Sequence, residues 1–399
     1  MHPDIEWITD VLWPGAEIRL ERGSPSTSGG DRYTVVGWGG RPRFLVPEAS
    51  RRASSASLFA YNKLRSLGTR AARTTMGMAV QLPPGLLRLP TLTADVSGDR
   101  SLGARLSDIF GREDLAAAVG IPPVGPNRKP VLQVFTLGGR PVGYVKVGWN
   151  EATRRRVRHE ARALEHWRGA TGRRTRLPHL VSAGRWGEHE ISVTAPLPTD
   201  VTHYPSSLGP PMLTFRDVCD LDGGLSTTTL AEIAGVTDLD SRLEVAATID
   251  PERAHAATRL TEAVRERFGG LQTLSSIAHG DCVPWNLARH RDALYLFDWE
   301  HWSGSMPVGF DLLYWHFQVA FVVERNPLAD ALDRATALTR NRMTAVGARD
   351  EIVPALACLL LVELYLRAAE GVAAGAPENA RFHPHIKEAL SVARQTLAG

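Results

Sequence analysis

The chain has 399 residues, of which 43% are apolar and 22% are charged, and its formal net charge is +3. This length predicts two or three domains with enough apolar residues for a sizeable core, and the composition is typical of a soluble globular protein. The net charge is too small to indicate a nucleic-acid-binding protein, which must neutralise many phosphates.

The cysteines Cys219, Cys282 and Cys358 are few, odd in number and far apart. This pattern argues against a disulfide framework or a zinc site and favours a cytoplasmic location. The first residues lack the basic region and apolar run of a signal peptide. The apolar run 352–362 is followed by Glu363 and is too short to cross a bilayer, so we predict a buried helix and no membrane span.

In chain order, the first hundred residues predict an extra α/β region. Residues 33–38 and 43–46 read as two strands joined by a Gly-Gly-Arg-Pro turn, and 24–30 as a loop. A basic helix is expected over 54–78; packing on its own domain is favoured over contact with a membrane surface or a partner. The polar stretch 91–101 is expected to be a linker.

A second β-rich segment follows. Residues 131–137 and 141–148 predict a hairpin, with Lys146 inside its second strand. Apolar side chains recur at helical spacing over 151–168, the helix that carries Glu160. Another strand pair is expected to include Leu180 and to end near Ala195.

The most specific pattern is His279-Gly280-Asp281 with Asn286, followed by Asp298 in an Asp-Trp-Glu triplet. Asp281 and Asn286 are five residues apart, so one loop can hold both. Residues 287–290 and 293–297 predict two strands that would return Asp298 to that loop. A carboxylate that receives a hydroxyl proton, beside an amide and a second carboxylate that hold Mg²⁺, suits phosphoryl transfer from ATP.

This motif resembles that of the aminoglycoside phosphotransferase and choline kinase superfamily, the small-molecule branch of the protein-kinase-like fold. Protein kinases have Arg where this chain has Gly280, and Phe-Gly where it has Trp299-Glu300. The resemblance covers residues 105 to 399, strongly at 279–300. It implies an α+β, bilobal fold with ATP in the cleft between a β-rich N-lobe and a helical C-lobe.

The resemblance also implies roles for individual residues. Asp281 is the expected catalytic base, and Asn286 and Asp298 are the expected metal ligands. Lys146 is expected to clamp the ATP phosphates and Glu160 to orient it, with Glu151 and Glu165 as alternatives to Glu160.

Backbone groups of Thr194, Ala195 and Leu197 are expected to bind adenine at the hinge. Segment 120–129 either covers the phosphates or is an ordinary Pro-rich loop. The expected domains are an accessory region over 1–100, an N-lobe over 101–198 and a C-lobe over 199–399.

The C-terminal segments 310–323, 328–346, 352–369 and 385–397 predict helices, which in this superfamily form much of the acceptor site. Asp311 is expected to support the catalytic loop. Ten Asp/Glu and nine Arg/Lys from residue 301 onwards show no acidic excess. We therefore expect a sugar, polyol, nucleoside-like or natural-product acceptor rather than an aminoglycoside. Two alternatives stay open. The acceptor could be a peptidyl Ser/Thr, or the protein could be a nucleotide-binding module that binds a protein partner through the N-terminal region.

Overall fold

The computed structural model describes residues 1–22, 30–81, 89–125, 128–170, 172 and 174–398. Most of the loop expected at 24–30 therefore lies outside the described residues. The contacts divide the chain into two compact units. Unit 1 comprises Met1–Pro123, Arg128–Ala161 and Pro178–Thr202, and unit 2 comprises Val124–Asn127, Arg162–Leu177 and His203–Gly399.

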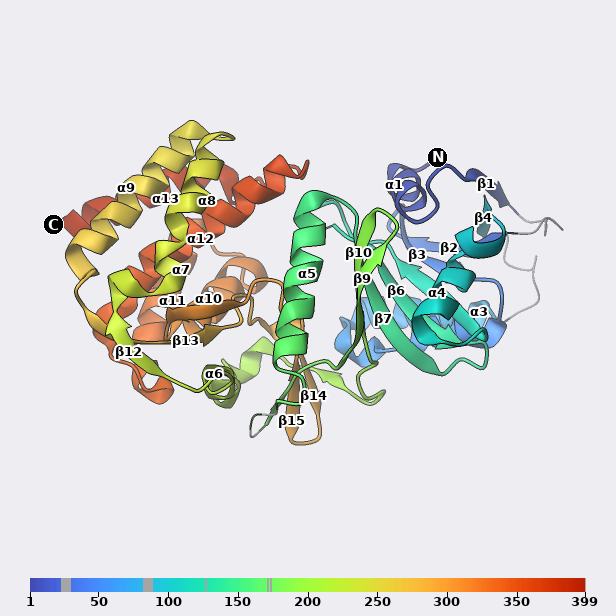
Figure 1. Ribbon diagram of the computed structural model, residues 1–399, viewed down its shortest axis with the longest axis horizontal. Helices are drawn as coiled ribbons and strands as arrows, with labels where there is room; N and C mark the ends of the chain where they lie inside the picture. The colour runs from blue at the N-terminus through green and yellow to red at the C-terminus, as the bar shows by residue number, and fades with distance from the viewer. Residues whose placement is uncertain (23–29, 82–88, 126–127, 171, 173, 399) are drawn as a thin grey trace. The chain divides into compact units, whose positions relative to one another are not determined.

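Unit 1 is built on a nine-stranded antiparallel sheet with the order β1-β4-β2-β3-β5-β6-β7-β10-β9 (Figure 1). Its strands are β1 (Glu17–Arg22), β2 (Asp31–Trp38), β3 (Arg41–Pro47), β4 (Pro90–Asp95), β5 (Leu115–Gly120), β6 (Val131–Thr136), β7 (Pro141–Gly148), β9 (Leu180–Trp186) and β10 (His189–Thr194). The first four strands come from residues 1–100, so these residues extend the same sheet as the later strands. The domain boundary near residue 100 stays a prediction.

Helices cover both faces of this sheet. Successive side chains of a strand point to opposite faces, so neighbouring residues of one strand pack against different helices. Leu132 and Val134 of β6 pack with Ile8 of α1 and Leu106 of α4, whereas Phe135 packs with Ala53 of α2 on the other face. The helices of unit 1 are α1 (Pro3–Leu12), α2 (Arg51–Phe59), α3 (Leu67–Ala79), α4 (Leu102–Phe110) and the part of α5 (Glu151–His166) that ends at Ala161.

The single helix expected over 54–78 is wrong. The chain forms α2 and α3 there, separated by a turn in which Tyr61 has φ of +53°, outside the right-handed helical region. Arg73 of α3 is buried and donates hydrogen bonds to the carbonyls of Ser57, Leu58 and Ala60 at the end of α2. These bonds satisfy carbonyls that a helix end leaves unpaired, which makes the break favourable.

The linker expected over 91–101 is also wrong. Residues 90–95 form β4, which pairs with both β1 and β2 inside the sheet. Leu92 and Ala94 are fully buried and pack in the core of unit 1. The polar residues that suggested a linker alternate with these apolar ones, which is the period of a strand, and Thr93 between Leu92 and Ala94 is buried as well.

Unit 2 is mainly helical, as expected. Helix α9 packs against α8, α12 and α13 (Figure 1). Its principal helices are α6 (Met212–Cys219), α7 (Ala234–Thr237), α8 (Leu239–Ala247), α9 (Pro251–Phe268), α10 (Phe310–Gln318), α11 (Leu328–Arg340), α12 (Val353–Ala373) and α13 (His383–Ala398). By length and composition the segment Asp350–Ala373 would span a bilayer, but 67% of its most apolar window is buried, as in a core helix.

Short strands of unit 2 flank the motif of residues 279–300. A three-stranded sheet has the order β12-β13-β16, and the hairpin β14–β15 pairs with β8. These strands are β8 (Thr175–Arg176), β12 (Ser226–Thr229), β13 (Gln272–Ala278), β14 (Leu287–His290), β15 (Ala293–Leu296) and β16 (Ser303–Pro307), and β11 (Thr202–His203) pairs beside β14. The hairpin expected from the sequence is therefore present.

Candidate active site

The loop after β13 holds Asp281 and Asn286 against each other. Nδ2 of Asn286 donates to the Asp281 carboxylate at 2.8 Å and to the Asp281 carbonyl at 3.0 Å. A short 3₁₀ turn over Pro284–Asn286 brings Asn286 back beside Asp281. In this turn the N–H of Asn286 donates to the Val283 carbonyl. Because Nδ2 faces Asp281, the carboxamide oxygen is the Asn286 atom with ligand chemistry for a cation.

Gly280 allows the sharp bend before Asp281. Its φ is +74°, and a Cβ atom there would lie 2.1 Å from the His301 carbonyl oxygen. The N–H groups of His279 and Gly280 both donate to the carboxylate of Asp311, at 2.7 and 2.8 Å. Asp311 thus supports the loop in the way the sequence predicted.

The β14–β15 hairpin brings Asp298 back to the loop. The N–H of Phe297 donates to the carbonyl of Asn286 at 3.1 Å, so the residue before Asp298 is bonded to the loop. Asp298 itself has φ of +66°, a left-handed conformation that Asp tolerates better than most residues. Trp299 is fully buried between His279 and Trp167, with ring centroids 4.5 and 5.2 Å away.

Four tryptophans of the sequence segments around this site, Trp285, Trp299, Trp302 and Trp315, differ in exposure. Trp299 and Trp315 are core residues, whereas Trp285 in the 3₁₀ turn is 42% exposed. Trp302 is partly buried and packs edge-on against Trp167, at 4.9 Å between ring centroids. Of Trp285, Trp299 and Trp315, only Trp285 presents a large part of its ring to solvent.

The electrostatics of the loop favour a bound cation. Burial raises the pKa of Asp281 to about 7; Arg367 opposes this rise, and the nearby carboxylates of Glu300 and Asp298 add to it. Burial also lowers the pKa of His279 to about 3, so this ring is neutral and its Nδ1 accepts the N–H of Asp281 at 3.2 Å. Crowded carboxylates of this kind are stabilised by a positive charge between them.

The donor set fits Mg²⁺ better than a softer metal. Asp298 and Asn286 offer hard oxygen ligands, which Mg²⁺ prefers, and the ion usually takes few protein groups. Within the described part of the chain no three His, Cys, Asp or Glu side chains are grouped as a metal site. A zinc centre of the usual kind is therefore not formed by these residues.

In unit 1, Lys146 of β7 and Glu160 of α5 form a close ion pair. Nζ of Lys146 lies 2.6 and 2.7 Å from the two carboxylate oxygens of Glu160. Both side chains are largely buried, at 18% and 3% exposure. The alternatives Glu151 and Glu165 are exposed: Glu151 pairs with Arg154 and Arg158 of the same helix, and Glu165 pairs with Arg168 just beyond its end.

The segment after β10 carries the predicted adenine-binding residues. Thr194 ends β10 between β7 and β9, and the N–H of Ala195 is bonded to the His179 carbonyl at 2.8 Å. The carbonyl of Leu197 accepts the Tyr61 hydroxyl at 2.5 Å. Since Pro196 and Pro198 have no N–H, the N–H of Leu197 is the donor that this segment retains for a base.

The segment 120–129, expected either to cover the phosphates or to be an ordinary loop, is only partly described, because residues 126 and 127 lie outside the described residues. Gly120 ends β5, and the carbonyl of Arg128 accepts Nε1 of Trp149 at 2.7 Å. Its phosphate-binding role stays a prediction.

Sequence reasoning missed Tyr61, Tyr314 and Arg367. Arg367 lies 87 positions after Gly280, yet its Nη1 donates to the Gly280 carbonyl at 2.9 Å and to the Tyr314 hydroxyl at 3.3 Å. No local spacing links these residues to the motif. The signal in the sequence is the pair Glu363 and Arg367, four positions apart in a largely apolar helical run, because buried charges require partners.

No family model matches the chain, and no curated protein matches it by sequence. Among solved structures, a thermostable mutant of aminoglycoside phosphotransferase APH(4)-Ia in its apo form is similar, with 12% identity and a TM-score of 0.51. The match covers 75% of this chain and 100% of that chain.

A ternary complex of an APH(4)-Ia thermostable mutant with AMP-PNP and hygromycin B is similar at 13% identity and a TM-score of 0.50, over 75% and 99% of the two chains. A choline/ethanolamine kinase family protein from Mesorhizobium loti is a weaker match, with 15% identity, a TM-score of 0.41 and coverage of 69% and 88%. The chain therefore has the α+β fold of the aminoglycoside phosphotransferases, as its motif at residues 279–300 indicated.

Proposed function

We propose that the protein is an ATP- and Mg²⁺-dependent O-phosphotransferase that acts on a hydroxyl group of a small molecule. The observation that carries this proposal is the loop geometry: Asn286 is bonded to Asp281, and the backbone next to Asp298 is bonded to Asn286. One short segment thus gathers a base and two oxygen ligands, the groups that phosphoryl transfer needs.

In the proposed reaction the acceptor oxygen forms a bond to the γ-phosphorus of ATP while the bond from that phosphorus to the β,γ-bridging oxygen breaks. Asp281 receives the hydroxyl proton, and the products are ADP and a phosphate ester. Asp298 and Asn286 would hold Mg²⁺, which neutralises charge on the phosphates when bound. Lys146, oriented by Glu160, binds phosphate oxygens, and Leu197 offers its N–H to the base.

The acceptor is proposed to be a neutral or weakly charged molecule with a hydroxyl group. The similar APH(4)-Ia structure contains hygromycin B, an aminoglycoside. In this chain the balance of ten acidic and nine basic residues from position 301 onwards gives no excess of negative charge for a polycation. A sugar, polyol, nucleoside-like compound or hydroxylated natural product suits that balance better.

The test is ADP release from Mg·ATP with a panel of sugars, aminoglycosides, nucleosides and hydroxylated natural products. Asp281→Asn is the test variant and Asp292→Asn the matched control, because Asp292 is exposed in the turn of the β14–β15 hairpin. We expect acceptor-stimulated release in the wild type and the control and its loss in Asp281→Asn. Full turnover by Asp281→Asn would contradict the proposed mechanism.

The same assay separates the alternatives. Release stimulated by a Ser/Thr peptide but by no small molecule would identify a protein kinase. Thermal stabilisation by Mg·ATP without turnover on any acceptor would identify a nucleotide-binding module, whose partner the N-terminal region would bind.

A further inference from the structure

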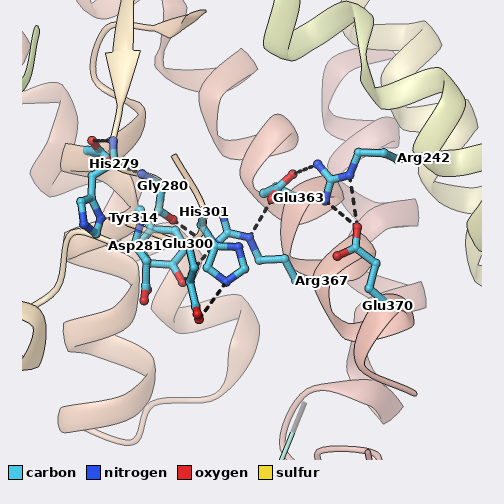
Figure 2. A network of polar contacts seen from close by, with 11 residues as sticks. Arg242, His279, Gly280, Asp281, Glu300, His301, Tyr314, Glu363, Arg367 and Glu370 are labelled. Carbon is cyan, nitrogen blue, oxygen red and sulfur yellow. Dashed lines mark hydrogen bonds and ion pairs between the residues drawn. The ribbon is translucent and has the colours of Figure 1, made fainter. Parts of the chain in front are cut away.

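A chain of charged side chains leads from the helices of unit 2 to the catalytic loop (Figure 2). Arg242 of α8 donates to Glu363 of α12 at 2.5 Å and to Glu370 at 3.1 Å. Glu363 accepts Nε of Arg367 at 2.7 Å, one helical turn further along α12. Arg367 is the member of this network that contacts the loop.

Glu363 makes it possible to bury the guanidinium of Arg367. The Arg367 side chain is only 13% exposed, and an unpaired charge at such a position would be strongly destabilising. Burial opposes ionisation of Glu363, but Arg367 and Arg242 outweigh that effect and hold its pKa at about 2. The pair therefore stays charged, and Arg367 keeps a fixed orientation.

The contact of Arg367 with the loop is at the peptide that precedes Asp281. Nη1 donates to the Gly280 carbonyl at 2.9 Å, while the N–H of Gly280 donates to Asp311 at 2.8 Å. The two peptides that flank Gly280 are thus held by opposite charges on two different helices. The same Nη1 donates to the hydroxyl of Tyr314, whose ring lies 5.2 Å from the guanidinium carbon.

We propose that Arg367 is a positioning residue of the catalytic loop: through the Gly280 carbonyl it fixes the backbone that carries Asp281. It also holds the hydroxyl of Tyr314, which is hydrogen-bonded to the Asp281 side chain. This proposal rests on the proposed function of Asp281 as the base. A hydrogen bond from a charged donor to a carbonyl is stronger than a neutral one and has defined geometry. A displacement of the base by about 1 Å can cost about 100-fold in rate.

The test compares Arg367→Met with Arg242→Met, which removes the other guanidinium bound to Glu363 and does not touch the loop. In each variant Glu363 keeps one arginine, so both variants lose a similar part of the network. We expect Arg367→Met to lower kcat about 100-fold with little change in KM for ATP, and Arg242→Met to retain kcat. Arg367→Lys, which keeps a charged donor, should recover part of the lost kcat.

A second readout does not depend on activity. Amide hydrogen exchange over residues 279–286 should become faster in Arg367→Met and stay at the wild-type rate in Arg242→Met. Equal exchange in the two variants, or wild-type kcat in Arg367→Met, would overturn the positioning role. If the wild type transfers no phosphate to any acceptor, the proposed function fails, while the exchange comparison still decides whether Arg367 holds the loop.

Discussion

Nζ of Lys146 lies within 2.7 Å of both carboxylate oxygens of Glu160, although the two residues are fourteen positions apart on a strand and a helix. Removing the lysine alone would take the close ion-pair contact from a buried carboxylate. We expect Lys146→Met to lower the unfolding free energy by about 3 kcal/mol and kcat/KM for ATP by about 100-fold.

The double variant Lys146→Met/Glu160→Gln separates these two effects, because it removes the buried carboxylate charge as well. Urea unfolding should show most of the stability restored, while steady-state kinetics should show no recovery of kcat/KM. If the double variant regained activity, the lysine would have no role in phosphate binding.

Asp298→Asn tests the proposed metal ligand without altering the backbone. Asn tolerates the left-handed conformation at this position as well as Asp does, so the melting temperature should stay close to that of the wild type. Loss of the carboxylate should lower kcat about 100-fold or more and raise the Mg²⁺ concentration required for half-maximal rate. An unchanged Mg²⁺ requirement would assign the metal to other residues.

Gly280→Ala is expected to disrupt the catalytic loop. The new Cβ atom would lie 2.1 Å from the His301 carbonyl, and φ of +74° is unfavourable for alanine. Gly304→Ala is the matched control, since the nearest atom to its Cβ would be at an ordinary 3.7 Å. Kinetics and circular dichroism should show a loss of activity in Gly280→Ala only; equal activities would show that the loop accommodates a side chain.

Tyr61→Phe tests whether residues before position 100 support base binding. The variant keeps the ring against Tyr144, at 5.5 Å between centroids, but removes the hydrogen bond to the Leu197 carbonyl. A bond worth about 1 kcal/mol corresponds to a rise of about fivefold in KM for ATP, with kcat unchanged. Tyr33→Phe, the same change at a buried residue of β2, should leave KM as in the wild type.

The low pKa of Glu363 leads us to expect a loss of folding stability in acid. The pKa of Glu363 is about 2 in the folded protein against an ordinary 4.5. Its contribution to the free energy of unfolding is therefore complete above about pH 5 and falls as the pH is lowered towards 2. Between pH 6 and pH 3 the wild type should lose about 2 kcal/mol more than Glu363→Gln, measured by urea unfolding. Parallel pH dependence in the two proteins would show that this ion pair does not respond to pH.

The sequence by itself determined the local parts of the site. Fixed spacing predicted that Asp281 and Asn286 share a loop, that a hairpin returns Asp298 to it, and that Lys146 lies on a strand before the helix of Glu160. The α+β class came from the resemblance of the motif at 279–300 to a known family. Short-range patterns suffice for the loop, the hairpin and the strand before the helix, because hairpins and helix faces are set by neighbouring residues.

Only the tertiary structure decided the parts that depend on distant contacts. It divided 54–78 into two helices, because Arg73 binds the carbonyls at the end of α2, and it placed 90–95 in the sheet, because β1 and β2 flank it. It also brought Arg367 to Gly280. A side chain's partner across 87 positions depends on how the helices pack, and that packing leaves no fixed spacing in the sequence.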